Sequence, residues 1–346
     1  MTKKFEPLLS AKIFSLKSPE QTEKNLSLLR WPKDVSIKYD GIRLVEYQGQ
    51  MHTRSLKVVR NLHVRDVMAD FIARAADRNV SGMDGEITVG PLTHPNLIDN
   101  TKSGVMSGSG TPEFEFQLFD SYQHPEREFT RRTEEMRNLH AALSREFPFL
   151  RWVEQKRARD RQEFLAMETK IVSDGHEGIM GRAPDGVYKF GRSTLLDGIL
   201  SALKRFVDDE CVVVGILEEV ENTNPLEENE LGRSKRSSHQ ENLVPKGRMG
   251  TFVCVSPSFD KPFKVGGGHG LTHAKRQEIW DNREKYLHQP LTYMFQEIGV
   301  KEKPRLPRYK AFRDWDDLPQ EKARALRRVL TLYLRHGKDF AVAEAE

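Results

Sequence analysis

Apolar residues in the N-terminal part of the chain recur with two periods, that of a β-strand and that of an α-helix. Alternating apolar and polar residues predict six strands, at residues 34–37, 43–47, 51–55, 82–89, 114–120 and 177–180. The strands at 43–47 and 51–55 flank a Gly-Gln turn, and we expect a hairpin that holds Lys38 and Arg54 in one sheet. Residues 101–112 are rich in Ser, Gly and Thr, which predicts a flexible loop.

Helical spacing of apolar residues predicts amphipathic helices beside these strands. Four helices are expected, at residues 20–29, 61–75, 128–145 and 161–170. Asn61 is placed to cap the second helix, whose apolar stripe is Val64, Met68, Phe71 and Ala75. Strand hairpins and flanking helices together predict an α+β domain over residues 1–207.

The C-terminal part follows a different pattern. Five short strands are expected at residues 210–217, 251–255, 263–265, 291–297 and 309–313, with one helix at 272–284. Short strands separated by glycine turns favour a small β-barrel, which we place at residues 208–317. Residues 218–250 within it are polar, and we expect a mobile excursion there. Residues 318–346 predict a basic C-terminal helix with Ala323, Leu326, Leu330 and Leu334 on its apolar side.

Composition narrows the class of protein. The 346 residues suffice for two domains, 31% of them are charged, and the net charge is +4. The chain has only two cysteines, Cys211 and Cys254, which excludes a disulfide framework and a four-cysteine zinc site. Both lie in apolar runs, so we expect buried thiols. The apolar runs are shorter than the ~18 residues of a membrane span, and residues 1–5 lack the apolar core of a signal peptide. We therefore expect a soluble protein of the cytoplasm that does not associate with membranes. We also expect it to be a monomer.

The segment Lys38-Tyr-Asp-Gly-Ile-Arg43 is the main candidate for chemistry. A predicted strand leads into Lys38, and the Asp-Gly pair predicts a tight turn before Arg43. A lysine amine attacks phosphorus only when it is deprotonated, and burial beside other cations lowers its pKa. Further along, Asp84 and Glu86 are two residues apart on one predicted strand and so share a face. The Lys38–Arg43 segment alone is also compatible with an exposed basic turn. Whether it is a catalytic segment depends on the polar residues further along the chain.

Further polar elements follow in a definite order. They are Arg54-Ser-Leu-Lys57, Asp84-Gly-Glu86, an aromatic strand that ends at Phe119-Asp120, Glu177-Gly178 and Lys204. Together with the Lys38 segment, this ordered set resembles the nucleotidyltransferase motifs of ATP-dependent DNA ligases. The chain is similar over nearly its full length to the compact two-domain ligases of bacteriophages and large viruses. The resemblance implies an adenylation domain with antiparallel sheets and flanking helices, followed by an OB-fold domain.

The resemblance also implies a reaction. Lys38 would attack the α-phosphorus of ATP, release pyrophosphate and carry AMP as a phosphoramidate. The AMP would then pass to nicked duplex DNA before a phosphodiester closes the nick, in replication, repair or recombination of a prokaryotic or phage-infected cell. The implied catalytic residues are Lys38, Arg43, Glu177 and Lys204.

The implied binding residues form three groups. The nucleotide would contact Ile37, Lys38, Arg43, Glu86 on the ribose, Phe119 on the adenine, Glu177, Lys189 and Lys204. Mg²⁺ or Mn²⁺ would be held by Asp84, Glu86 and Glu177, because carboxylate oxygens suit such ions. Nicked DNA would be held, largely without regard to base sequence, by Arg54, Lys57, Arg192, Lys235, Arg236, Arg305 and Arg308. The cations Lys189, Arg192 and Lys204 would lower the pKa of Lys38.

One position departs from the family pattern. The fifth motif of the family usually carries two lysines separated by one residue, and here the pair is Ala202-Leu-Lys204. Alanine cannot neutralise charge on the α-phosphate, and one lost charged donor typically costs roughly 100-fold in rate. Either Lys189, Arg205 or an arginine of the second domain compensates, or adenylyl transfer is impaired.

Other functions share parts of this pattern. An RNA ligase would use the same lysine and carboxylates, and an mRNA capping enzyme would load GMP in place of AMP. A catalytically silent nucleic-acid-binding protein on a ligase scaffold is favoured only by Ala202. The intact Lys38, Glu86 and Glu177 argue against that third alternative.

Overall fold

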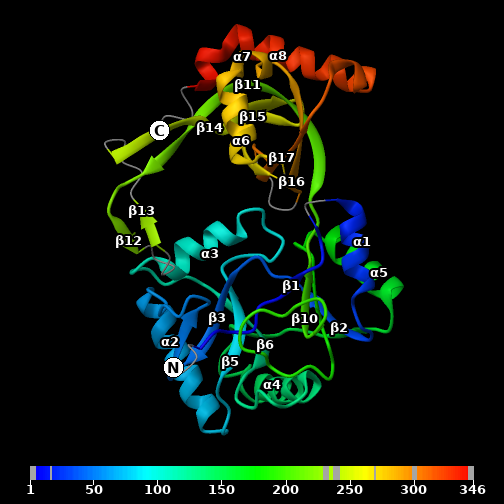
Figure 1. Ribbon diagram of the computed structural model, residues 1–346. Helices are drawn as coiled ribbons and strands as arrows, with labels where there is room; N and C mark the ends of the chain where they lie inside the picture. Colours follow the sequence, from blue (N-terminus) through cyan, green and yellow to red (C-terminus); the bar gives the residue numbers. More distant parts are fainter. Residues whose placement is uncertain are drawn as a thin grey trace. The chain divides into compact units, whose positions relative to one another are not determined.

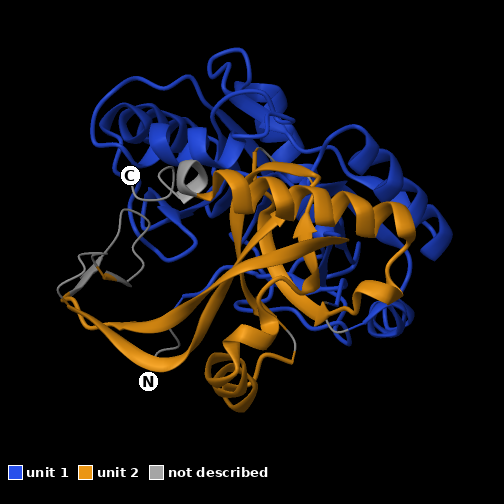
Figure 2. Cartoon of the chain, turned by 90° about the horizontal axis from the view of Figure 1, so that it is seen from above, with its two compact units in different colours: residues 1–205, 228–235 blue, residues 206–227, 236–346 orange. Residues whose placement is uncertain are grey.

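The computed structural model describes residues 5–15, 18–228, 234–236, 242–268, 270–297 and 302–341. The chain divides into two compact units, coloured separately in Figure 2. The N-terminal unit comprises residues 1–205 and 228–235, and the C-terminal unit comprises residues 206–227 and 236–346. No helix of the described residues is long and apolar enough to cross a membrane.

The N-terminal unit contains two five-stranded sheets. Figure 1 labels β1, β2 and β10 of the first sheet and β3, β5 and β6 of the second. The first sheet has the order β1-β10-β9-β2-β8. Its strands are β1 (Ala11–Lys12), β2 (Lys33–Ile37), β8 (Lys156–Ala158), β9 (Ile179–Arg182) and β10 (Leu200–Leu203). All neighbours in this sheet are antiparallel except β1 and β10, which run parallel.

The second sheet has the order β4-β3-β5-β6-β7. Its strands are β3 (Ile42–Tyr47), β4 (Gln50–Thr53), β5 (Met83–Thr88), β6 (Glu115–Ser121) and β7 (Leu150–Trp152). The predicted hairpin is confirmed, with Leu44 of β3 opposite Thr53 of β4. The expectation that it holds Lys38 in the same sheet is wrong. The chain leaves the first sheet after β2 and enters the second at β3, so that Lys38 and Arg54 follow strands of different sheets.

Five helices flank these sheets, and the N-terminal pattern locates four of them. They are α1 (Pro19–Ser27), α2 (Leu62–Ala76), α3 (Leu97–Met106), α4 (Phe129–Leu143) and α5 (Arg161–Ser173). The side chain of Asn61 caps α2 by accepting a hydrogen bond from the Val64 amide at 2.9 Å. The predicted stripe of α2 is buried with Met136 and Leu139 of α4 in one apolar core against the second sheet.

The helix α3 corrects the first half of the predicted loop at residues 101–112, whereas residues 107–112 form neither helix nor strand. Leu97, Thr101 and Val105 are buried at a spacing of four residues, which is the spacing of one helix face. The Thr101 hydroxyl donates to the Leu97 carbonyl at 2.7 Å and accepts from the Val89 amide at 3.0 Å. The polar side chain of Thr101 is therefore part of the buried face of a helix. A composition rich in Ser, Gly and Thr does not predict this.

The C-terminal unit contains a five-stranded barrel of the predicted OB type. Its strands are β11 (Val207–Asn222), β14 (Leu243–Ser256), β15 (Phe259–Gly268), β16 (Pro290–Gln296) and β17 (Arg305–Phe312). They pair in the order β11-β14-β15-β17-β16, and β16 returns to β11. The barrel core includes the thiols of Cys211 and Cys254, both buried. Short helical segments accompany the barrel at α6 (His273–Asp281), α7 (Arg283–Tyr286) and η2 (Trp315–Asp317).

The expected mobile excursion at residues 218–250 is partly regular structure. Strand β11 continues to Asn222 and β14 begins at Leu243, with Glu218 opposite Met249 and Glu221 opposite Val244. Two shorter strands, β12 (Leu226–Glu228) and β13 (Ser234–Arg236), lie between them in the sequence. Strand pairing uses backbone groups, so a polar composition does not prevent it. The side chain of Lys235 lies outside the described residues.

The C-terminal helix α8 (Gln320–Ala341) confirms the predicted basic helix. Leu326 is fully buried, and Leu330 packs beside it against the barrel. Leu334, by contrast, is 59% exposed, and Tyr333 occupies the next contact position. An α-helix repeats every 3.6 residues, so a residue three positions after Leu330 can face the barrel as well as one four positions after it. Here Tyr333 takes that place and Leu334 faces solvent.

Candidate active site

A cavity of about 550 Å³ in the N-terminal unit is lined by residues from both sheets. Five of the predicted nucleotide-binding residues line it, namely Ile37, Lys38, Arg43, Glu86 and Phe119. The first two come from the end of β2, and the others come from β3, β5 and β6. Residues predicted from one ordered set of motifs therefore meet around one space.

Lys38 is held beside Glu177 by strand pairing. Ile37 of β2 is opposite Ile179 of β9, and the Lys38 amide donates to the Gly178 carbonyl at 2.9 Å. The Lys38 ammonium pairs with Oε2 of Glu177, and the Lys204 ammonium pairs with Oε1 of the same carboxylate. Glu177 thus bridges two of the predicted catalytic lysines, although the three residues are far apart in the sequence.

This ion pair reverses the expected pKa of Lys38. Burial lowers the pKa of Lys38, but the adjacent Glu177 carboxylate outweighs burial and raises the pKa above its ordinary value. The predicted lowering by neighbouring cations is therefore wrong. Lys204 is itself paired with Glu177, and Lys189 pairs with Asp197 at 2.7 Å between Nζ and Oδ2.

Gly178 is required for the close approach of this segment to β10. Its φ angle is +151°, and an added Cβ would lie 2.3 Å from the Leu203 carbonyl oxygen. A side chain at this position would push Glu177 away from the neighbouring Lys204. The Glu-Gly pair of the sequence is thus explained by packing as well as by charge.

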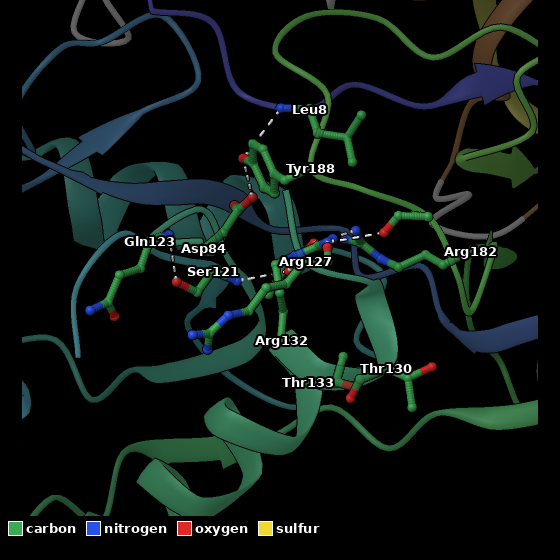
Figure 3. A network of polar contacts seen from close by, with 12 residues as sticks. Leu8, Asp84, Ser121, Gln123, Arg127, Thr130, Arg132, Thr133, Arg182 and Tyr188 are labelled. Atoms are coloured by element: carbon green, nitrogen blue, oxygen red, sulfur yellow. Dashed lines mark hydrogen bonds and ion pairs between the residues drawn. The ribbon is translucent and has the colours of Figure 1, made fainter. Parts of the chain in front are cut away.

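Arg43 is fixed by a buried carboxylate. Nε of Arg43 lies 2.8 Å from Oδ1 of Asp84, and the Tyr188 hydroxyl donates to Oδ2 of Asp84 at 2.8 Å. The Leu8 amide in turn donates to the Tyr188 hydroxyl at 3.3 Å. Asp84 is fully buried, and Figure 3 shows it beside Tyr188 in this network. Both carboxylate oxygens of Asp84 therefore serve to orient Arg43.

The three-carboxylate metal site predicted at Asp84, Glu86 and Glu177 is not formed. Asp84 is committed to Arg43, and Glu177 is committed to two lysines. Within the described ranges, no group of three or more acidic, Cys or His side chains could hold a metal ion. Mg²⁺ often takes only one or two protein carboxylates and fills its shell with phosphate oxygens and water.

Glu86 is a half-buried acid at the cavity wall, opposite Arg43 in the pairing of β5 with β3. Burial raises the pKa of Glu86 to about 8, against the lowering effect of Lys38. Glu86 is therefore largely protonated at neutral pH. In that form its hydroxyl donates a hydrogen bond, and its carbonyl oxygen accepts one.

Two guanidinium groups lie close to the ring of Phe119. The Cζ atom of Arg182 is 5.2 Å and that of Arg43 is 5.8 Å from the centre of the Phe119 ring. Arg182 also lines the cavity and pairs with Asp120 at 2.7 Å, and Arg132 pairs with the same carboxylate at 2.9 Å. Figure 3 shows Arg132 and Arg182 in this network. Sequence reasoning missed Arg182, which shares a face with Met180 at a spacing of two.

The remaining predicted residues are scattered. Arg54 and Arg192 line the cavity. Lys57, three residues after Arg54, is half-buried and does not line it. In the C-terminal unit, Arg305 and Arg308 lie on β17 and Arg236 donates to the Asn224 carbonyl. Two further cavity cations, Lys12 and Lys102, were not predicted. Lys12 lies in an N-terminal segment whose sequence pattern is weak.

Comparisons with known proteins agree with this architecture. A family model described as ATP dependent DNA ligase domain matches residues 18–196, and one described as DNA ligase OB-like domain matches residues 243–313. A search of curated protein sequences found no significant match.

Solved ligase structures are similar over most of the chain. The Chlorella virus DNA ligase-adenylate is 26% identical with a TM-score of 0.48, covering 89% of this chain and 99% of that chain. A structure from a study of Lig E DNA ligases is 21% identical with a TM-score of 0.61, covering 89% and 99%. The bacteriophage T7 ligase in complex with ATP is 15% identical with a TM-score of 0.45, covering 90% and 100%. Because the first family model matches more than half of the 346 residues, the chain belongs to the ATP-dependent DNA ligase family.

Proposed function

We propose that this ligase seals nicks in duplex DNA through an AMP carried on the Nζ atom of Lys38. The observation that supports it most is the placement of Lys38 at a cavity of about 550 Å³, paired with Glu177 and facing Arg43, Glu86 and Phe119. The Lys38 amine is the nucleophile, the Glu177 carboxylate is paired with it, and the cavity is large enough for a nucleotide. This combination is what a reaction through a covalent lysyl-nucleotide intermediate requires.

In the proposed first step, Lys38 Nζ forms a bond to the α-phosphorus of ATP. The bond from that phosphorus to the oxygen bridging the β-phosphate breaks, and pyrophosphate leaves. The ammonium of Lys38 must first lose a proton, which the ion pair with Glu177 opposes. We propose that this proton passes to solvent water before the attack, while Lys204 on the other oxygen of Glu177 keeps a positive charge beside the reaction.

The nucleotide contacts follow from the cavity lining. Phe119 would stack on the adenine and Glu86 would contact the ribose hydroxyls. Arg43, oriented by Asp84, would bind ribose and phosphate oxygens through its planar fork. Lys189 does not line the cavity and pairs with Asp197, so we assign it no contact with ATP. Mg²⁺ or Mn²⁺ would accompany the phosphates of ATP and neutralise part of their charge.

The DNA contacts are proposed from charge and position. Arg54, Lys57 and Arg192 belong to the N-terminal unit, and Arg236, Arg305 and Arg308 belong to the C-terminal unit. Lys235 is a further basic residue of this set. Contacts of Arg and Lys to phosphates are largely independent of base sequence and weaken with salt. We propose that the protein acts as a monomer in the cytoplasm, on nicks left by replication, repair or recombination.

One experiment separates this function from its neighbours. The protein is incubated with ATP or GTP labelled at the α-phosphate, and then with duplexes that carry a nick in DNA or in RNA. We expect label from ATP alone, transfer of AMP to the 5′-phosphate of nicked DNA, and sealing. Label from GTP would indicate a capping-type reaction, sealing confined to RNA would indicate an RNA ligase, and no label would indicate a silent binding protein.

A further inference from the structure

Four residues form one row across the first sheet. Lys12 of β1 is opposite Ala202 of β10, Ala202 is opposite Met180 of β9, and Met180 is opposite Ser36 of β2. Residues directly opposite each other on neighbouring strands present their side chains on the same face. Lys12, Met180 and Ser36 all line the cavity that contains Lys38. The row therefore faces the proposed site of adenylation.

Ala202 leaves room in this row for the side chain of Lys12. Ala202 carries a single methyl group and is 8% exposed, whereas Lys12 is exposed. The four-carbon stem of a lysine is longer than the roughly 4.8 Å between neighbouring strands. The Lys12 ammonium can therefore reach the space in front of Ala202 without any movement of the backbone.

The charge of Lys12 is available to an anion. Several cations of the cavity are already neutralised by carboxylates, in the pairs Lys38–Glu177, Arg43–Asp84, Lys102–Asp99 and Arg182–Asp120. Lys12 has no ion pair with any residue that the structure describes. A phosphate group in the cavity would be an anionic partner for it.

Two cations of the N-terminal unit considered for this role, Lys189 and Arg205, are paired elsewhere. Lys189 pairs with Asp197 at 2.7 Å, and Arg205 pairs with Glu168 at 2.6 Å. Neither of them lines the cavity. Lys12 is a cavity cation that approaches Ala202 from the adjacent strand.

We propose that Lys12 supplies from β1 the positive charge that position 202 lacks, and that it binds a non-bridging oxygen of the α-phosphate as Lys38 attacks. This assignment rests on the proposed function of the cavity. Ala202 then does not indicate impaired chemistry, because the positive charge comes from Lys12 on the neighbouring strand and the reacting groups are unchanged. Lys12 is thereby a catalytic residue of the adenylation step.

The test is single-turnover self-adenylation by the full chain with labelled ATP, at saturating and at limiting ATP. Lys12→Met keeps the stem and removes the charge, and we expect roughly 100-fold slower adenylation at saturating ATP. Lys12→Arg should retain most of the rate. Ala202→Lys alone should leave the rate nearly unchanged, and Lys12→Met with Ala202→Lys should recover to within about tenfold of the unaltered protein.

Controls separate the failure of this inference from failure of the proposed function. Lys24→Met, at an exposed position of α1, should adenylate at the normal rate. If the unaltered protein forms no AMP adduct, the proposed function fails. If it forms the adduct and Lys12→Met reacts equally fast, the role of Lys12 is refuted. A slow Lys12→Met variant that Ala202→Lys does not rescue would also refute it, because the loss would then come from β1 itself.

Discussion

The guanidinium of Arg43 lies against the carboxylate of Asp84, with 2.8 Å between Nε and Oδ1. Asp84 is fully buried and also accepts a hydrogen bond from Tyr188, so both of its oxygens already have hydrogen-bond partners. Asp84 is a positioning residue, and Arg43 is the group that reaches the cavity. The two carboxylates of the Asp-Gly-Glu segment therefore have different tasks.

We predict that Asp84→Asn destabilises the protein by about 3–5 kcal/mol, because removing one partner of a buried ion pair leaves the other uncompensated. The free energy of urea unfolding measures this loss. Glu115→Gln is the control, because Glu115 pairs with the exposed Arg151 at the surface, and we expect a loss of about 1 kcal/mol or less. Normal stability together with an altered dependence on Mg²⁺ concentration would instead identify Asp84 as a metal ligand.

A second prediction concerns pH and the nucleophile. Glu177 raises the pKa of Lys38, and only the neutral amine attacks, so the adenylation rate should rise with pH towards that raised pKa. Glu177→Gln removes the negative charge, lowers the pKa of Lys38 and should move the profile to lower pH. Single-turnover rates over a range of pH measure this shift. Glu163→Gln, at a half-buried acid of α5 that pairs with the exposed Arg159, should leave the profile in place. An unmoved profile in Glu177→Gln would contradict the account.

A third prediction concerns Glu86 and stability. Its folded pKa of about 8 lies above the ordinary value of 4.5, so the folded state holds a proton that the unfolded state releases between these values. Unfolding free energy should therefore fall as pH rises from about 4.5 to about 8, and this contribution should level off above that range. Glu86→Gln should remove the contribution, giving a shallower fall than in the unaltered protein. Equal slopes in the two proteins would show that Glu86 ionises normally.

A fourth prediction concerns Gly178. An alanine there would adopt φ near +151° and would place Cβ 2.3 Å from the Leu203 carbonyl, so Glu177 and β10 must separate. We expect a loss of at least about 1–3 kcal/mol in unfolding free energy, together with slower adenylation. Gly108→Ala is the matched control, because no atom lies within 4 Å of its added Cβ. Comparable stability in the two variants would contradict the close approach inferred at Gly178.

The features that the sequence predicted best are formed by residues close to one another in the chain. The stripe of α2 and its cap at Asn61 follow from residues within one helix, and the pairing of β3 with β4 follows from residues within one hairpin. Of the predicted nucleotide-binding residues, Ile37, Lys38, Arg43, Glu86 and Phe119 line the cavity. Glu177, Lys189 and Lys204 of the same predicted set do not line it.

What the sequence did not predict depends on contacts between distant segments. The raised pKa of Lys38 follows from Glu177, which is 139 residues away and arrives through the pairing of β2 with β9. Lys12 faces Ala202 only because the two-residue strand β1 joins the edge of the first sheet. Residues 218–222 and 243–250 look like a polar excursion, yet they pair through backbone hydrogen bonds that composition does not report.

The central claim is that the amine of Lys38 carries AMP. The most direct test is mass spectrometry of the intact protein after incubation with ATP and Mg²⁺, followed by peptide mapping of the adduct. We predict a gain of one AMP, located on the peptide that contains Lys38 and absent from Lys38→Ala. An adduct on another residue, or no adduct in a protein that still seals nicks, would contradict this account.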